Sequence, residues 1–126
     1  LRGRSYLVGI ISGGLDLVVD QVARQVQVQP EHTFSNSSIL FDAEDYLEKI
    51  VARGQDHEVK LADLHRLCQL WGIPLNECAY VGDGHADYPL FMATGNGITF
   101  NSERCSMLHG SCWRRIAELP DLLHFL

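Results

Sequence analysis

The sequence lacks the features that mark several large classes of protein. It has no apolar run near the roughly 20 residues needed to span a bilayer, and nothing in it resembles a signal peptide. The four cysteines form no CxxC pair and the six histidines are scattered, so the sequence contains no zinc motif. It also has no repeats and no low-complexity segment. What remains is the sequence of an ordinary globular domain.

Positive charge is scarce as well. Lys and Arg number 10 against 16 Asp and Glu, a formal net charge of -6, which argues against nucleic acid or a membrane surface as a partner. The net charge does not exclude a small anionic substrate, because such a substrate needs only local positive groups. The 126 residues, 46% of them hydrophobic, suffice for one domain with a sizeable core. We expect a single domain over residues 1–126, located in the cytoplasm, with its thiols reduced.

Apolar periodicity predicts alternating strands and helices. Residues 6–12 predict a buried strand that stops at Gly13 and Gly14, and residues 15–26 predict a helix. That helix would carry its apolar residues on one side: Leu15, Val18, Val19, Val22 and Val26. Further strands are expected at 32–41 (interrupted by small polar residues), 77–83 and 97–100, and further helices at 58–73, 86–95 and 112–126. This order predicts an α/β fold with a mainly parallel sheet covered on both faces.

Residues 42–54 are ambiguous. Local propensity favours a helix there, but two strands joined by a polar turn also fit the pattern.

The strand expected at 6–12 ends in groups suited to an anion. Ser12 offers a hydroxyl, and Gly13 and Gly14 offer flexible backbone just before a helix N-terminus. Free N–H groups at such a terminus favour phosphate. A tight strand-to-helix turn explains the same residues without a ligand, and the pattern alone leaves both interpretations open.

Two carboxylates follow the strand expected at 77–83. Asp83 comes at its carboxyl end and Asp87 lies four residues later. Paired carboxylates on a loop suit Mg²⁺, which keeps several waters and takes one or two protein carboxylates. A turn-forming Asp83 and a helix-capping Asp87 explain the pair equally well.

Lys60 begins the helix expected at 58–73, at the edge of the sheet where ligands bind in open α/β proteins. A lone lysine is usually a solvated surface residue. Because Ser12 and the carboxylate pair are expected at the same edge of the sheet, a contact between Lys60 and a phosphate group is favoured. His57 and His85 flank the same elements, and we assign them no role.

Together these residues match a known pattern. The stretches "VGIISGGLDLVVDQVA" and "VGDGHADYPLFMATGNGITFN", with Lys60 between them, resemble the haloacid dehalogenase superfamily in its phosphoserine-phosphatase-like branch. The similarity covers residues 6–123 and includes "FSNSSILF". It implies a Rossmann-like three-layer α/β/α core, and it favours a β-hairpin over 38–42 and 46–52.

The resemblance also implies an activity, that of a Mg²⁺-dependent phosphomonoesterase acting on a small phosphorylated substrate. In this branch the residues matching Ser12, Gly13 and Lys60 hold the phosphoryl group. The residue matching Asp83 ligates Mg²⁺, and the one matching Asp87 is a catalytic residue that supports the metal and the lysine. Phosphoryl transfer needs such positioning and charge neutralisation.

The sequence departs from the family pattern in two places. The fourth motif is usually GDGxND, and Ala86 stands at the asparagine position, which puts substrate orientation in doubt. The family's nucleophile is the first Asp of a DxDx[TV] motif, whose second Asp is the general acid and base. No two aspartates of this chain are two residues apart, so that motif is absent, and so is the helical cap that usually follows it.

Three hypotheses remain. In the first, the chain is the carboxyl-terminal portion of a phosphatase, a fragment that begins at Leu1 and is inactive alone. In the second, it is a non-catalytic binding or interaction domain. A flavodoxin-like domain is a weaker third, since it leaves Ser12, Lys60 and the carboxylate pair unexplained. The missing strand would be central, so we expect self-association or an N-terminal segment to cover the open sheet edges.

Overall fold

The computed structural model describes residues 6–100 and 112–125. The chain divides into two compact units, Arg2–Asp63 and Leu64–Leu126, which we call the amino-terminal and carboxyl-terminal units. Helix α2 (Asp56–Trp71) contributes its first half to one unit and its second half to the other. The single domain expected from the sequence stays a prediction.

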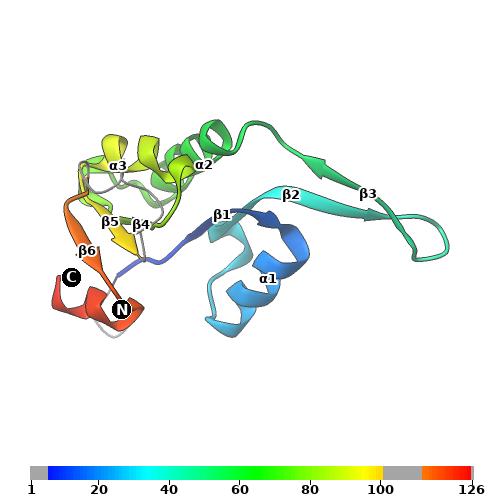
Figure 1. Ribbon diagram of the computed structural model, residues 1–126, viewed down its shortest axis with the longest axis horizontal. Coiled ribbons are helices and arrows are strands. Elements are labelled where there is room, and N and C mark those ends of the chain that lie inside the picture. Colours follow the sequence, from blue (N-terminus) through cyan, green and yellow to red (C-terminus); the bar gives the residue numbers. More distant parts are fainter. Residues whose placement is uncertain (1–5, 101–111, 126) are drawn as a thin grey trace. The chain divides into compact units, whose positions relative to one another are not determined.

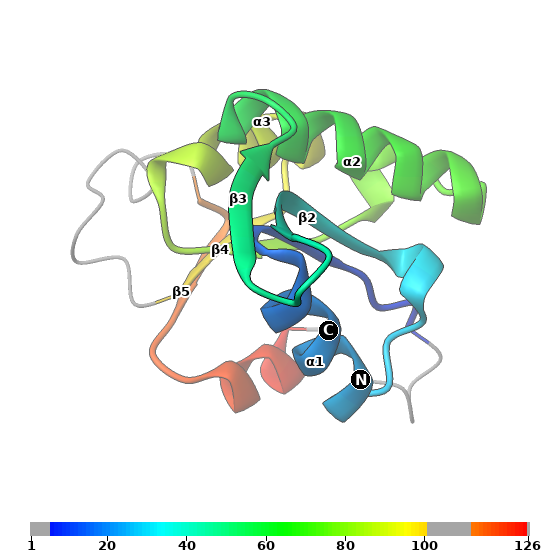
Figure 2. The same cartoon turned by 90° about the vertical axis from the view of Figure 1, so that its right-hand side faces the viewer.

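The amino-terminal unit is a three-stranded sheet with one packed helix. It contains β1 (Ile10–Leu15), α1 (Asp16–Gln25), β2 (Thr33–Phe41), β3 (Leu47–Ala52) and the start of α2 (Figure 1). The strand order is β1-β2-β3, with β1 parallel and β3 antiparallel to β2. α1 packs against β1 and β2 (Figure 2). Since α1 follows β1 directly, its N-terminus lies at the carboxyl end of that strand.

β2 and β3 form the hairpin that the resemblance favoured over a helix. Asp42 closes the turn, because its Oδ1 accepts the N–H groups of Glu44 and Tyr46 at 2.9 Å each. β2 is continuous, and the expected interruption by small polar residues is wrong. Ser37 and Ser38 pair with Ala52 and Val51, so their backbone bonds hold the ladder where side chains contribute little.

The carboxyl-terminal unit is a parallel three-stranded sheet with its own core. It contains β4 (Tyr80–Gly82), α3 (Tyr88–Thr94), β5 (Gly97–Phe100) and β6 (Arg114–Ile116), in the strand order β4-β5-β6. Ile98, Ile116 and Leu122 form one buried cluster, and Phe91 anchors another against Tyr80 and Tyr88. β5 is central and almost fully buried, as its apolar run predicts.

The structure corrects three expectations. The first strand covers Ile10–Leu15 and runs through the glycines at which residues 6–12 were expected to stop. Only Val19 of the predicted apolar side of α1 is buried with Ala23, while Val18, Val22 and Val26 are exposed. The expected helix at 112–126 is instead β6 followed by the 3-10 helix Leu119–His124, because Arg114 to Ile116 pair with β5.

These elements confirm an α/β fold with mainly parallel strands, since three of the four strand pairings are parallel. The strands lie in two sheets of three. Among the described residues, β1 bonds only to β2 and β4 only to β5, so each is an edge strand. In the same part of the chain, no helix has both the length and the apolar character required to cross a membrane.

Candidate functional site

The carboxyl end of β1 carries the predicted anion-binding turn. Ser12 lies in β1 beside Ser35, and its Oγ accepts the N–H of Gly14 at 3.0 Å. The register of β1 against β2 shifts between Ser12 and Leu15, where the two glycines stand. The Ser12 hydroxyl therefore has a defined position within β1, just before the irregular stretch that contains Gly13 and Gly14.

Asp56 links Lys60 to this turn, because its carboxylate contacts both. The Lys60 Nζ is 3.4 Å from Asp56 Oδ2, one helical turn away on α2. The same carboxylate lies over the backbone of Gly13, where an added Cβ would be only 2.5 Å from Asp56 Oδ1. Gly13 and Lys60 thus contact one carboxylate, and a side chain at residue 13 would exclude it.

Asn36 completes this group and was missed from the sequence. Its Nδ2 donates to Asp56 Oδ1 at 3.3 Å and to the Gly54 carbonyl at 3.1 Å. The side chain is buried, with 6% exposed, and no described residue donates a hydrogen bond to its Oδ1. A buried acceptor without a partner is uncommon and often marks a functional position. Its place in "FSNSSILF" was the only signal that the sequence offered.

Asp16 fixes the start of α1 beside the turn. Its Oδ1 accepts the N–H groups of Leu17 at 2.8 Å and Ile39 at 3.2 Å. Burial acts to raise the pKa of Asp16, but these bonds and one from Ser38 outweigh it, so the pKa lies below its usual value. The bond to Ile39 joins the N-terminus of α1 to β2.

The end of β4 carries the predicted acid pair, in which the two carboxylates differ sharply. Asp87 is 3% exposed, and its Oδ2 accepts the N–H groups of Asp83 and Gly84 at 3.0 Å each. The Tyr80 hydroxyl donates to its Oδ1 at 3.0 Å. Asp83 is exposed. Asp87 therefore shapes the loop, and Asp83 presents its carboxylate to solvent.

Gly82 is required for this arrangement. A Cβ at residue 82 would lie 2.5 Å from the carboxyl carbon of Asp87, so any larger residue would displace that side chain. The first glycine of "VGDG", Gly82, therefore allows the Asp87 side chain to pack directly against the backbone.

The donors fit Mg²⁺ only in part. Asp83 is one exposed hard-oxygen ligand of the kind Mg²⁺ uses alongside its waters. Within residues 6–100 and 112–125, no three His, Cys, Asp or Glu side chains are arranged to hold a metal ion. Asp83 is thus the one predicted metal ligand whose carboxylate is exposed in this part of the chain, and a complete Mg²⁺ site would need further ligands from water or from outside these residues.

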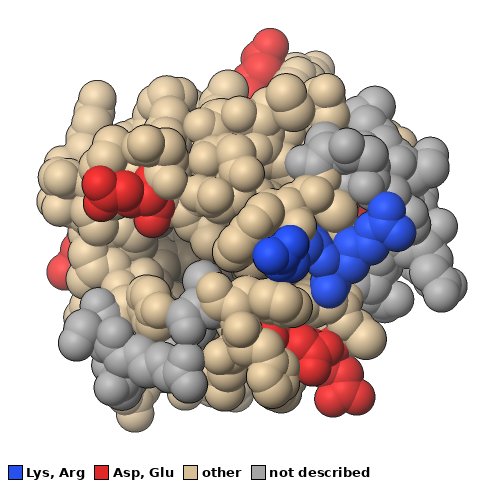
Figure 3. Space-filling model, turned by 90° about the vertical axis from the view of Figure 1, so that its left-hand side faces the viewer, with Lys and Arg blue, Asp and Glu red and all other residues tan. Residues whose placement is uncertain are grey.

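The predicted residues thus form two groups. Gly13 and Lys60, with Ser12 adjacent, gather around Asp56 in the amino-terminal unit, and Asp83 and Asp87 share a loop in the carboxyl-terminal unit. His57 and His85 are exposed. On the face shown in Figure 3, the Lys and Arg side chains gather in one small group and the Asp and Glu side chains are scattered.

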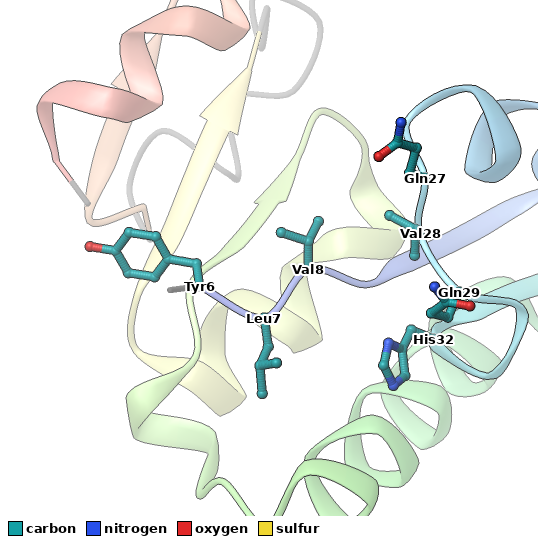
Figure 4. A pocket seen from close by; sticks show the side chains of 7 residues that line it. All are labelled: Tyr6, Leu7, Val8, Gln27, Val28, Gln29 and His32. Atoms are coloured by element: carbon teal, nitrogen blue, oxygen red, sulfur yellow. The ribbon is translucent and has the colours of Figure 1, made fainter. Parts of the chain in front are cut away.

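A separate hollow of about 300 Å³ lies in the amino-terminal unit (Figure 4). Val8, Val28 and His32 are among the residues that line it, and they precede β1 or follow α1. It is therefore at the amino end of β1, opposite the end that carries Ser12.

Cys78 lies just before β4, and its thiol is next to a second thiol. Cys68, Cys78 and Cys112 are free, and Cys105 lies outside the described residues. The Sγ atoms of Cys68 and Cys78 are 3.5 Å apart. Burial, and then the hydrogen bond to Cys68, raise the pKa of Cys78 to about 11, so this thiol stays protonated and weakly nucleophilic at neutral pH.

Comparisons with known proteins agree on one family. The profile of haloacid dehalogenase-like hydrolases matches residues 18–104. The phosphoserine phosphatase of Methanocaldococcus jannaschii is 27% identical over 103 residues, covering 79% of this chain and 46% of the relative. That of Streptomyces coelicolor is 28% identical over 104 residues, covering 82% of this chain and 24% of the relative. The chain spans about half, or less, of these relatives.

Solved structures show the same fold. A substrate-bound phosphoserine phosphatase complex matches 99% of this chain and 58% of its own, with a TM-score of 0.84 and 21% identity. A phospho-aspartyl intermediate analogue of phosphoserine phosphatase matches 100% of this chain and 59% of its own, with a TM-score of 0.84 and 22% identity. At this low sequence identity, the structural similarity establishes the fold alone, which is a Rossmann-like architecture.

Proposed function

Because the chain belongs to the haloacid dehalogenase-like hydrolase family, we propose that it forms the carboxyl-terminal part of a Mg²⁺-dependent phosphomonoesterase of the phosphoserine-phosphatase type. The substrate class is a small phosphorylated molecule. The observation that carries the proposal is the β4 loop, where buried Asp87 fixes the backbone that presents exposed Asp83. Asp87 also caps the short helix His85–Asp87, and this cap holds Asp83 in its exposed position at the end of β4.

The phosphoryl group would be held by Ser12, Gly13 and Lys60. This part of the proposal is supported by the Lys60 side chain, which is 13% exposed. Its ammonium contacts the Asp56 carboxylate, which lies over Gly13, the residue that follows Ser12. A compact cation in such a place neutralises charge on phosphate oxygens without needing a particular orientation. The hydroxyl donates to a phosphate oxygen, and the backbone at Gly13 permits close approach.

Asp83 would ligate Mg²⁺, and Asp87 would keep that ligand in place. Bound Mg²⁺ would neutralise the negative charge that develops on the phosphoryl oxygens. Asp87 acts on the loop through three hydrogen bonds, so its role is to position Asp83 and Gly84. Ala86 leaves the substrate without the amide contact found in the family pattern.

The nucleophilic carboxylate would come from outside these 126 residues. The chain has no DxDx[TV] motif, and it corresponds to about half the length of the Methanocaldococcus jannaschii relative. In the described part of the chain, β1 and β4 are each edge strands, and each edge could pair with a strand from outside it. We therefore expect the chain alone to be inactive.

Activity and metal binding test the proposal together. With Mg²⁺, the chain alone is expected to hydrolyse phosphoserine no faster than buffer. In an NMR titration, Mg²⁺ is expected to shift the amide signals of Asp83 and Gly84, and Asp83→Asn is expected to remove those shifts. The matched control is Asp20→Asn on α1, which removes an exposed carboxylate elsewhere. A titration that leaves Asp83 and Gly84 unmoved would contradict the metal site.

The second candidate is a non-catalytic binding domain of the same fold, favoured by the missing nucleophile and by Ala86. The two candidates differ in the protein extended by an amino-terminal segment that carries DxDx[TV]. Phosphatase activity that falls with Asp83→Asn supports the enzyme. Persistent inactivity of a folded extended protein supports the binding domain.

Self-association is expected as long as the sheet edges stay open. Within residues 6–100 and 112–125, β1 and β4 are edge strands with one strand neighbour each, and the exposed hairpin side chains Leu47, Ile50 and Val51 add apolar surface. Light scattering of the chain alone should therefore show dimers or larger species whose fraction rises with concentration. A monomer at all concentrations would contradict this expectation.

A further inference from the structure

We propose that the carboxylate of Asp56 occupies the anion-binding position beside Gly13 and Lys60, so that a phosphate group binds there only by displacing it. The inference rests on the proposed function, because it assigns a built-in competitor to the same phosphate site. Asp56 would then set how tightly the site holds phosphate, without belonging to the residues that hold it.

The contacts of Asp56 are those expected of a bound anion. Its Oδ2 is 3.4 Å from Lys60 Nζ, and its Oδ1 accepts the Nδ2–H of Asn36 at 3.3 Å. The carboxylate also lies where a Cβ on Gly13 would stand. One cation, one amide donor and one open glycine backbone surround a single oxyanion. A phosphate oxygen needs donors of the same kind.

The start of α2 does not depend on the Asp56 carboxylate. The Gln55 carbonyl accepts the N–H groups of Glu58 at 3.1 Å and Val59 at 3.0 Å, which closes the first turn. The Asp56 side chain is 38% exposed, whereas that of Lys60 is 13% exposed. The carboxylate can therefore swing out to water while the helix and the lysine keep their places.

Asn36 holds the Asp56 carboxylate with only part of its hydrogen-bonding capacity satisfied. Donating Nδ2–H to Asp56 and Gly54 leaves the buried Oδ1 with no donor from the described residues. Leaving a buried acceptor unpaired is unfavourable, by about 1–3 kcal/mol in general. The Asn36 amide that holds Asp56 is therefore incompletely satisfied in this arrangement.

Electrostatics decides the direction of the effect. A phosphate ester carries about 1.5–2 negative charges near neutral pH, so it attracts Lys60 more strongly than one carboxylate does. Until Asp56 leaves, however, its charge repels the ligand and occupies the ammonium. Removing that charge without changing the shape of the side chain should therefore strengthen phosphate binding.

The test compares the dissociation constant for inorganic phosphate in the chain and in Asp56→Asn, by calorimetry and by NMR shifts of the Gly13 amide. Asp56→Asn is expected to bind phosphate roughly tenfold more tightly, a typical coupling between competing ligands. Asp56→Ala serves as a second variant, with thermal unfolding to verify that each protein is folded. Glu58→Gln is the matched control, because it removes one exposed carboxylate from the same helical turn.

The outcomes separate this inference from the proposed function. Tighter binding in both Asp56 variants and little change in Glu58→Gln support displacement. Binding that is unchanged or weaker in the Asp56 variants overturns the inference while the phosphate site stands. An equal gain in Glu58→Gln also overturns it, because net charge alone would then explain the effect. No phosphate binding by any folded variant overturns the phosphate site and this inference with it.

Discussion

Replacing Asp87 by alanine is expected to destabilise the protein by about 3 kcal/mol, because it removes the shared acceptor of a buried loop. The N–H groups of Asp83 and Gly84 and the hydroxyl of Tyr80 all donate to this carboxylate, which is 3% exposed. Without it these donors lose their acceptor, and the space left beneath Gly82 adds a cavity. Loss of the loop should also abolish the Mg²⁺-dependent shifts at Asp83.

Urea unfolding measures this loss, and Asp83→Ala is the matched control. Asp83 is exposed, so its removal should change the free energy of unfolding by less than about 0.5 kcal/mol. Asp83→Ala should nevertheless remove Mg²⁺ binding. An equal loss of stability in the two variants would show that Asp87 is no more structural than its neighbour. The urea slope should stay constant if both proteins unfold in two states.

Replacing Arg53 by methionine is also expected to cost about 3 kcal/mol, because it leaves the carboxylate of Asp63 buried without its cation. Arg53 bonds Asp63 through two nitrogens at 2.7 Å each, and the Asp63 side chain is 3% exposed. The hydrogen bonds to Asp63 raise the pKa of Arg53 above its usual value, so the guanidinium stays charged. Arg53 also donates to the Ser35 carbonyl. The pair thus joins the end of β3, the neighbour of Asn36 in β2, and the helix that carries Lys60.

A double variant separates the ion pair from the packing of Arg53. Arg53→Met with Asp63→Leu should recover most of the lost stability, because no charge is then left buried. Arg24→Met on α1 is the matched control, with an expected change under about 0.5 kcal/mol, since the Arg24 side chain is exposed and its hydrogen bond within the described residues goes to the Asp20 carbonyl. If the double variant is as unstable as Arg53→Met, then the stem of Arg53 or its bond to Ser35 is what stabilises the fold.

Local pattern predicted the elements whose apolar period is unambiguous. The helix expected at 58–73 is α2, and the strand expected at 97–100 is β5. In both, one repeat distance dominates the apolar residues, so sequence and packing agree. The hairpin at β2 and β3 was different, because local propensity favoured a helix and only the family resemblance indicated strands. Backbone pairing across the turn overrides propensity there.

The errors fall where long-range pairing decides. Residues 112–126 contain a helix-like apolar spacing, yet Arg114–Ile116 form β6 because a free edge of β5 is available to them. The extent of burial on the apolar side of α1 was also misjudged. Periodicity indicates which face of a helix is apolar, but it does not indicate how much of that face a sheet covers. Neither outcome could be deduced from neighbours in sequence.

For the candidate site, the sequence by itself determined which chemical groups are available: the Ser12 hydroxyl in β1, the Lys60 ammonium in the first turns of α2, and Asp83 with Asp87 after β4. Spacing and residue type suffice for that, because a parallel strand presents whatever follows it at its carboxyl end. Only the tertiary structure decided what each group does. It buries Asp87 under its own loop, leaves Asp83 exposed, and places Asp56 against Gly13 and Asn36 against Asp56. Asn36 and Asp56 are 20 residues apart and Gly13 and Asp56 are farther apart still, so only packing of strands and helix brings them into contact.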